Sequence, residues 1–181
     1  SSAAKRSDDL GDLANDENIV ERFVERIAPI AKRAAEKLGV DHLLLVAQSA
    51  LETGWGKHVI KDDKGNSSNN LFNIKGGASW GNDSVQHTTL EFRDGTMMRE
   101  SALFRAYNSL EDSVNDYVNF VQGGERYQTA VANADDPEAY IQSLHKGGYA
   151  TDPQYSAKVL SVYEKVKAVL NADSADSERG V

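Results

Sequence analysis

A segment with almost no polar face, residues 41–56, constrains the fold of this chain most strongly. A helix over this segment would be apolar on nearly every side, because it contains Leu43, Leu44, Leu45, Val46, Ala47, Ala50 and Leu51. A helix that is apolar all round is expected to be buried by other elements. Asp41 is a suitable N-cap, and Gly54 can adopt the left-handed conformation that ends a helix. The segment therefore predicts a central helix around which the other elements pack.

Glu52 lies in the last turn of this predicted helix. Unpaired backbone carbonyls give that turn partial negative charge, and the preceding side chains are apolar, so both effects disfavour the ionised carboxylate. A carboxyl group that stays protonated near neutral pH is suited to act as a general acid. The alternative is a solvated end-of-helix residue that pairs with Lys57 or His58. Because an acidic residue at this end opposes the helix dipole, the sequence favours the functional interpretation.

The overall composition fits one domain and excludes several classes of function. With 181 residues, 40% of them hydrophobic, the chain can bury a single core. A net charge of −8 argues against nucleic-acid binding, which requires clustered Lys and Arg. No apolar run reaches the length of a membrane span. The absence of Cys excludes disulfides and thiolate chemistry, and it allows an extracytoplasmic location.

The domain is predicted to span residues 16–171, between disordered tails at 1–15 and 172–181 that are small, charged and aperiodic. The chain starts with neither a signal peptide nor an initiator Met, so we expect a piece of a longer protein. Apolar residues at helical spacing before Gly39 predict either two helices or one helix kinked at Pro29. Further helices are predicted after Ser109 and Asp136, followed by a long final helix from Tyr155.

A two-stranded hairpin is predicted between the two helical regions. Residues 84–92 and 96–107 are rich in β-branched and apolar residues, and they flank Arg93-Asp94-Gly95. Strand alternation places Leu90 and Phe92 on one face and Glu91 on the other, with Thr89 and His87. The pattern alone favours a solvated strand residue at Glu91. The expected fold class is α+β, predominantly α, with two lobes and a groove between them.

The inventory of reactive side chains leaves few kinds of chemistry open. The four His residues lack metal-ligand spacing, so no metal site is predicted, and no Ser nucleophile elbow is present. Two carboxylates remain, together with aromatic residues that could line a cleft: Trp55, Phe72, Trp80, Tyr107 and Tyr149. Sugar rings pack on aromatic faces, and glycosidic bonds are cleaved by an acid that works with a second carboxylate. Each aromatic residue taken singly is also compatible with a place in the core.

Five segments in order resemble glycoside hydrolase family 73, and the resemblance covers about residues 19 to 171. They are Ala47-Gln-Ser-Ala-Leu-Glu-Thr-Gly-Trp-Gly56, Asn70-Leu-Phe-Asn-Ile-Lys75, Thr88-Thr-Leu-Glu-Phe92, Phe104-Arg-Ala-Tyr107 and Gly148-Tyr-Ala-Thr-Asp-Pro153 with Tyr155 and Lys158. The resemblance implies a lysozyme-like fold with a small β-hairpin lobe beside the active-site cleft. It also implies cleavage of the β-1,4 bond after N-acetylglucosamine in peptidoglycan.

The same resemblance implies roles for individual residues. Glu52 falls on the catalytic acid, Glu91 on the second carboxylate and Tyr149 on an active-site tyrosine. Asn70 and Phe72 fall on a substrate-binding motif in which Asn73 replaces a common Gly, so the local backbone is expected to differ. Asn70 and Phe72, together with the aromatic residues Trp80 and Tyr107, are predicted to bind substrate.

Several alternatives stay open at this stage. The mechanism can be retaining, inverting or assisted by the substrate's N-acetyl group, because the sequence does not give the spacing of the carboxylates. A lytic transglycosylase, a muramidase or a non-catalytic glycan-binding module would each be compatible with the fold. The expected partners are peptidoglycan glycan strands and, if the chain belongs to the flagellar branch of the family, rod proteins. The expected location is the periplasm or cell envelope, and no cofactor is required.

Overall fold

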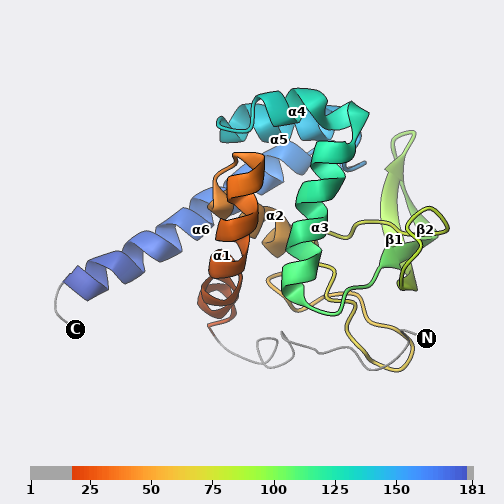
Figure 1. Ribbon diagram of the computed structural model, residues 1–181, viewed down its shortest axis with the longest axis horizontal. Coiled ribbons are helices and arrows are strands. Elements are labelled where there is room, and N and C mark those ends of the chain that lie inside the picture. Colours follow the sequence, from red (N-terminus) through yellow and green to blue (C-terminus); the bar gives the residue numbers. More distant parts are fainter. Residues whose placement is uncertain (1–17, 179–181) are drawn as a thin grey trace.

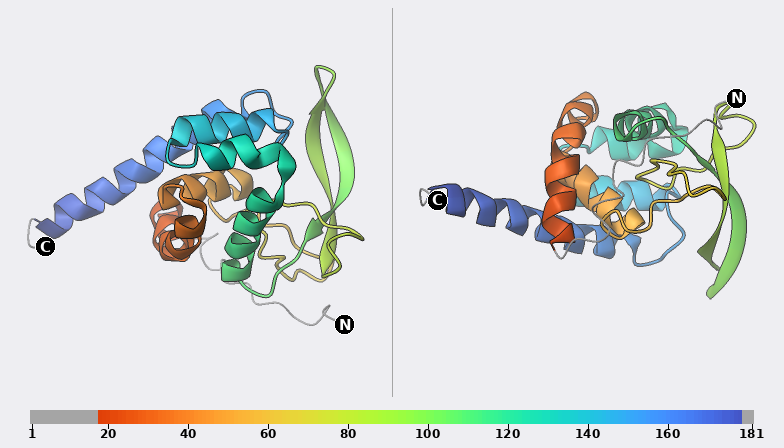
Figure 2. Two further views of the ribbon diagram at one scale, coloured as in Figure 1. Left: turned by 45° about the horizontal axis from the view of Figure 1, so that its top comes forward. Right: turned by 90° about the horizontal axis from the view of Figure 1, so that it is seen from below.

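The computed structural model describes residues 18–178. The elements in chain order are α1 (Ile19–Leu38), α2 (His42–Thr53), β1 (Ser84–Arg93), β2 (Thr96–Arg105), α3 (Leu110–Gly123), the 3₁₀ turn η2 (Glu125–Tyr127), α4 (Gln128–Ala132), α5 (Pro137–Lys146) and α6 (Tyr155–Glu178). The helices form one body, and the β1–β2 hairpin stands beside it (Figures 1 and 2). The predicted α+β class, in which helices predominate, is therefore confirmed.

Helix α2 lies at the centre of the helical body, as the apolar segment predicted. It packs between α1 and α6, and most of its side chains are buried. The predicted caps are present: the Asp41 carboxylate accepts a hydrogen bond from the Leu43 amide at 3.0 Å, and Gly54 is left-handed with φ 57°. These caps fix both ends of the helix, and therefore the position of Glu52 in its last turn.

A buried polar network fixes the orientation of α2. Gln48, which is fully buried, donates from Nε2 to the Tyr155 hydroxyl at 3.0 Å and accepts from the Tyr117 hydroxyl at 2.7 Å. The Tyr117 hydroxyl also lies 2.6 Å from that of Tyr140. Because a buried amide is costly unless its donors and acceptors are paired, this network favours one rotation of the helix. Glu52 is one helical turn beyond Gln48, so the same rotation places it on the same face of the helix, past the end of this network.

The segment around Pro29 forms one continuous helix rather than two. Helix α1 includes Pro29 in its interior and ends at the left-handed Gly39. Ile27 and Ile30, on either side of the proline, are both buried in the main core. Shared burial on both sides of the proline explains why the helix continues although one backbone hydrogen bond is lost.

The hairpin has the predicted turn. Strands β1 and β2 pair in antiparallel register from Ser84–Arg105 to Arg93–Thr96. Asp94 and Gly95 both have positive φ, at 49° and 80°, which is typical of the turn that matches the twist of a hairpin. The base of the hairpin packs in a small cluster separate from the main core, formed by Ile60, Val85, Phe104 and Ala106.

The final helix is longer than the sequence predicted. Helix α6 continues to Glu178, so the part of the predicted C-terminal tail from residue 172 to 178 is helical. Between Tyr155 and Gly180 the sequence contains no Gly or Pro that would end the helix, and each added residue contributes one more helical hydrogen bond. The predicted N-terminal tail, 1–15, lies outside the described residues, as do residues 179–181. Within residues 18–178, no helix is long and apolar enough to cross a membrane.

Candidate active site

A groove of about 770 Å³ separates the helical body from the hairpin. Its walls come from segments that are far apart in the sequence. They are the end of α2, the loop 72–79, strand β1, the end of β2, the α3–η2 region and the segment 148–158. Both predicted carboxylates, Glu52 and Glu91, line it, and so does Tyr149. The fold thus brings together on one groove the three residues that the sequence proposed as catalytic.

Glu52 enters the groove from the last turn of α2. Its pKa is raised to about 7, chiefly by burial; a hydrogen bond from Asn73 opposes this shift, and the nearby Glu91 adds to it. Among the described residues, its carboxylate forms no ion pair with Lys57 or His58, the partners of the alternative interpretation, and accepts a hydrogen bond from Asn73. A carboxyl group with this pKa is half protonated at neutral pH and can donate a proton there.

Asn73 holds the backbone and the side chain of Glu52 at once. Its Nδ2 donates to the Glu52 carbonyl at 3.1 Å and to Glu52 Oε2 at 3.0 Å. The residue is left-handed, with φ 51°, a conformation that glycine adopts without strain and that asparagine tolerates better than most residues. The Asn73 side chain therefore positions the carboxyl group of Glu52, and the positive φ explains why Gly is compatible with this place in the chain.

Asn70, predicted to bind substrate, is instead fully buried beneath the groove. Its Nδ2 donates to the carbonyls of Ile74 and Arg105, at 3.0 and 2.8 Å, and its Oδ1 accepts from the amides of Phe72 and Ile74. All of its hydrogen-bonding capacity is used inside the protein. Asn70 therefore stabilises the loop that carries Asn73. Its buried side chain has no exposed surface for contact with a ligand.

Glu91 projects toward the helical body from the face of β1 that the alternation predicted. The Thr151 hydroxyl donates a hydrogen bond to Glu91 Oε2 at 3.4 Å. The same hydroxyl oxygen accepts a hydrogen bond from the Phe92 amide at 3.1 Å. Lys75 Nζ lies 3.7 Å from Glu91 Oε1. One threonine therefore links the hairpin to the segment 148–152, and a cation stabilises the negative charge of the second carboxylate.

Tyr149 and Phe72 form the aromatic part of the groove floor. The Tyr149 hydroxyl donates to the Phe72 carbonyl at 3.3 Å, and burial, together with nearby tyrosines and Glu52, holds the pKa of Tyr149 well above its usual range. The Phe72 ring stacks on Tyr117, with centroids 4.2 Å apart, and is almost fully buried. Tyr149 thus stays neutral beside the acid, and Phe72 supports the floor from below.

Trp80 and Tyr107, the other two predicted substrate-binding residues, do not line this groove. They line a separate hollow between the loop 80–83 and α3. Sequence spacing could not separate these two sites, because loop 72–79 belongs to the first and residues 80–83 to the second.

The sequence analysis did not assign Asn73, Lys75 and Thr151 as site residues, although each contacts one of the two carboxylates. All three lie inside segments that carried the family resemblance. Their roles depend on contacts across 21, 16 and 60 positions of the sequence, which local pattern does not report. Among residues 18–178, no group of three or more His, Asp or Glu side chains is arranged to hold a metal ion.

A mostly helical body, a hairpin lobe and two facing carboxylates define a glycosidase-type site with a lysozyme-like architecture. A sequence model of the glucosaminidase family, described as mannosyl-glycoprotein endo-beta-N-acetylglucosaminidase, matches residues 28–168. The chain belongs to this family of glycoside hydrolases.

Curated relatives include the peptidoglycan hydrolases FlgJ of Vibrio parahaemolyticus and Pseudomonas aeruginosa. The chain is 50% identical to the first over 82% of its own length and 47% identical to the second over 81%. It spans 48% and 37% of the lengths of these two relatives. The matches therefore concern one part of each longer protein.

Solved structures of similar proteins share the fold. The glycoside hydrolase domain of Salmonella typhimurium FlgJ superposes with a TM-score of 0.71 at 34% identity, covering 89% of this chain and 96% of that one. A mutant peptidoglycan hydrolase from Sphingomonas sp. A1 superposes with a TM-score of 0.79 at 40% identity, covering 84% and 99%. The expected lysozyme-like architecture with a hairpin lobe is thus shared with structurally characterised hydrolase domains.

Proposed function

We propose that this domain hydrolyses the β-1,4 glycosidic bond after N-acetylglucosamine in peptidoglycan. The observation that carries the proposal is the pair of carboxyl groups facing one groove, of which Glu52 has a pKa near 7 and Glu91 lies beside Lys75. A carboxyl group that can donate a proton near neutral pH and a second carboxyl group on the other wall are the two groups that glycoside hydrolysis requires.

In the proposed reaction, Glu52 transfers its proton to the oxygen of the leaving sugar as the bond from that oxygen to the anomeric carbon breaks. Glu91 stabilises the positive charge that develops on the sugar ring and accepts a proton from the attacking water. The water oxygen forms the new bond to the anomeric carbon. A proton must then pass to Glu52 to restore the starting state, so one water is consumed in each cycle.

The proposed substrate agrees with the relatives, which are named peptidoglycan hydrolases. The groove is open and has aromatic and polar walls, which suits a polymeric sugar strand. By the same likeness we propose that the whole protein opens the cell wall locally for flagellar rod assembly, with rod proteins as partners. A periplasmic or cell-envelope location is part of this proposal.

The decisive experiment identifies the sugar at the newly formed chain end. Purified peptidoglycan is digested with the protein, the fragments are reduced with borohydride, and the modified terminal sugar is identified by mass spectrometry. The expected product carries reduced N-acetylglucosamine. Reduced muramic acid would indicate a muramidase, and an anhydro end that resists reduction would indicate a transglycosylase.

The control for this experiment is Glu52→Gln, which keeps the shape of the side chain and removes the transferable proton. Parallel digests should then release no soluble sugar. If the unchanged protein itself binds peptidoglycan but releases nothing, the proposal is overturned in favour of a binding module.

A further inference from the structure

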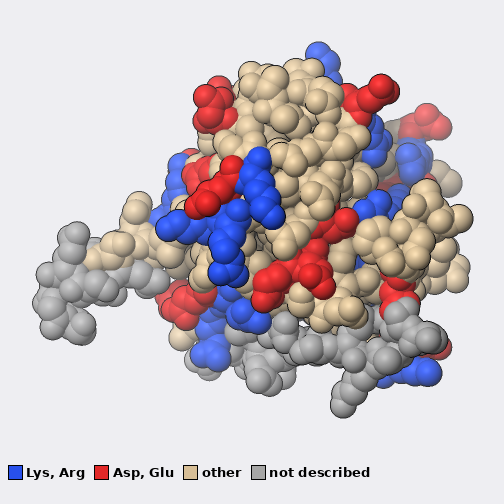
Figure 3. Space-filling view, viewed as in Figure 1, with Lys and Arg blue, Asp and Glu red and all other residues tan. Residues whose placement is uncertain are grey.

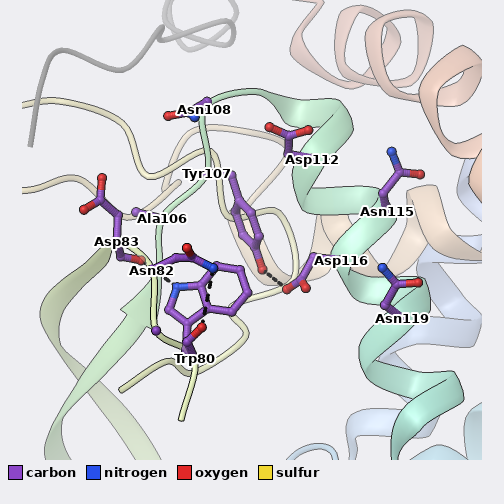
Figure 4. A pocket seen from close by; sticks show the side chains of 11 residues that line it. Trp80, Asn82, Asp83, Ala106, Tyr107, Asn108, Asp112, Asn115, Asp116 and Asn119 are labelled. Atoms are coloured by element: carbon purple, nitrogen blue, oxygen red, sulfur yellow. Dashed lines mark hydrogen bonds between the residues drawn. The ribbon is translucent and has the colours of Figure 1, made fainter. Parts of the chain in front are cut away.

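A second hollow, of about 620 Å³, lies beside α3. It is separate from the groove that contains Glu52. Figure 4 shows it between the loop that carries Trp80 and the exposed side of α3. The remaining lining residues are Gly81, Asn82, Asp83, Ala106, Tyr107, Asn108, Asp112, Asn115, Asp116 and Asn119. This set is unusual because it combines two aromatic rings with four carboxamides.

The aromatic wall of the hollow is held in place by hydrogen bonds and ring contacts. Trp80 Nε1 donates to the Asp83 carbonyl at 2.8 Å, and the Tyr107 hydroxyl donates to Asp116 Oδ2 at 2.6 Å. The two ring centroids are 5.7 Å apart. Because the polar atoms of both rings are already paired and Tyr107 is buried, a ligand in the hollow would meet the partly exposed ring of Trp80, held in place by Tyr107.

The opposite wall is a row of unpaired polar side chains. Asp112, Asn115 and Asn119 project from one side of α3, where residues three and four apart lie next to each other. All three are exposed, and none makes a side-chain hydrogen bond to the part of the chain described here. Carboxamides offer both donors and acceptors, and a carboxylate accepts from neighbouring hydroxyls. Such a wall matches the hydroxyl and acetamido groups of a sugar.

Arg105 connects this hollow with the active-site groove. Its guanidinium lies 4.4 Å from the centroid of the Trp80 ring and donates to Asp116 Oδ2 at 2.8 Å, so it supports both walls of the hollow. Arg105 is also a lining residue of the groove. The two sites are therefore neighbours with Arg105 between them, which is the arrangement expected if one glycan strand occupies both.

The charge of the hollow limits the class of ligand. Asp83, Asp112 and Asp116 all line it, and Arg105, a described basic residue that contacts its walls, is already paired with Asp116. Figure 3 shows acidic side chains gathered over the lower half of α3 on this face. An anionic group, such as the carboxylates of a stem peptide, would be repelled here. An uncharged sugar carries no such penalty.

We propose that this hollow is an additional saccharide-binding subsite, which holds an N-acetylated sugar of the same glycan strand that is cleaved in the groove. The proposal rests on the proposed function, because it assigns the hollow to the same polymeric substrate. The partly exposed Trp80 contributes the aromatic surface, the buried Tyr107 supports that ring from behind, and the exposed side chains of α3 contribute the hydrogen bonds. Trp80 thus retains a direct role in substrate binding, at a distance from the two catalytic carboxylates, and Tyr107 a supporting one.

The test uses the Glu52→Gln protein, so that the ligand is not turned over, and titrates it with hexa-N-acetylchitohexaose and with di-N-acetylchitobiose. Nitrogen–proton correlation spectra report the carboxamide signals of Asn115 and Asn119 and the indole signal of Trp80. We expect these signals to move with the hexasaccharide, together with signals from the groove. Only the groove signals should move with the disaccharide at the same site occupancy.

Binding constants for the same two ligands then test the role of α3. Asn115→Ala combined with Asn119→Ala should weaken binding of the hexasaccharide about tenfold, as the loss of two hydrogen bonds implies, and leave that of the disaccharide unchanged. Asn171→Ala is the matched control, because Asn171 is also an exposed helical asparagine without a side-chain hydrogen bond to another described residue. It should change neither constant.

Two outcomes would overturn the subsite. One is a hexasaccharide titration in which the signals of the hollow stay unchanged or the double variant binds as tightly as its parent. The other is a response of those signals to an amine-bearing stem peptide and not to the sugar. Failure of the proposed function is distinct: there, the protein with Glu52 intact would release no reducing ends from peptidoglycan, whatever the behaviour of the hollow.

Discussion

The two sides of the groove support their carboxylates in different ways. Glu52 extends from α2, a helix enclosed by α1 and α6 and fixed by a buried hydrogen-bond network. Glu91 extends from a two-stranded hairpin whose outer surface exposes Leu90 and Met97 to more than half of their area. The helical side thus supplies a well-packed, desolvated carboxyl group, and the hairpin side a carboxylate on a partly exposed strand.

This difference matches the two chemical tasks. A general acid needs a raised pKa, which requires surrounding protein, whereas a carboxylate that stabilises positive charge should stay ionised and benefits from a nearby cation. The hairpin has little packing beyond its base and is tied near Glu91 through Thr151. Elements with few buried contacts open locally at low cost. We therefore expect the acid side to be rigid and the hairpin side to adjust to the glycan.

The largest expected effect comes from the rigid side. Glu52→Gln removes the carboxyl proton at the end of α2, so release of reducing ends from peptidoglycan should fall by about 1,000-fold or more. Reducing-end assays at neutral pH measure this loss. Turnover close to normal would contradict the assignment of Glu52 as the acid.

The stability of this variant shows whether the loss is chemical. The pKa of Glu52 in the folded protein, about 7, is above its unfolded value of about 4.5, so ionisation destabilises the folded state increasingly as the pH rises from 4.5 to 7. Glu52→Gln should thus match the parent in stability at pH 4 and be more stable at pH 8, by roughly 1–3 kcal/mol. A less stable variant at pH 8 would indicate that the loss of activity comes from misfolding.

The second carboxylate should matter less. Glu91→Gln removes the negative charge that faces the groove, and we expect activity to fall about 100-fold with the fold unchanged. Glu100→Gln is the matched control, because Glu100 is on the same face of the hairpin and pairs with Arg93. That control should retain most of the activity. An equal loss in both variants would point to the hairpin's general charge and not to Glu91.

The link between the lobes gives an intermediate effect. Thr151→Val keeps the shape of the side chain and removes both the bond to Glu91 and the acceptor for the Phe92 amide, so we expect about a tenfold loss of activity. Hydrogen exchange at the Phe92 amide should become faster. Thr88→Val, on the exposed face of the same strand, is the control. Unchanged exchange in the Thr151 variant would show that the hairpin is fixed by other contacts.

The smallest effect is a shift in pH dependence. Activity that needs protonated Glu52 should decline as the pH rises through about 7. Asn73→Gly preserves the left-handed backbone and removes a hydrogen bond that lowers the pKa of Glu52, so the midpoint of this decline should move to higher pH. The gain in protonated acid at pH 7 is less than about twofold. Kinetic pH profiles measure the midpoint.

Asn69→Gly is the matched control for that variant. Asn69 is also left-handed, with φ 54°, and its side chain donates to the Tyr107 carbonyl instead of to Glu52. Its pH midpoint should stay unchanged. The same shift in both glycine variants would mean that loop flexibility, and not the contact with Glu52, determines the pH dependence.

Much of the fold could be predicted from local sequence. The all-round apolar segment indicated the central helix, Asp41 and Gly54 indicated its ends, and Asp94-Gly95 indicated the hairpin turn, because caps and turns depend on the conformational preferences of a few adjacent residues. Glu52 followed from its place at the end of that helix. The length of α6 beyond residue 171 was missed, since a polar, aperiodic segment gives no packing signal.

The functions of the other site residues depended on tertiary contacts. Nothing in the local sequence distinguishes the buried Asn70, whose four hydrogen bonds shape a loop, from Asn73, whose amide reaches Glu52. Likewise Trp80 and Phe72 are close in sequence but line different hollows. The sequence alone thus determined most of the elements, the candidate acid and the family resemblance. The tertiary structure decided which side chains reach Glu52 and Glu91, because burial and long-range hydrogen bonds exist only once the helical body and the hairpin have come together.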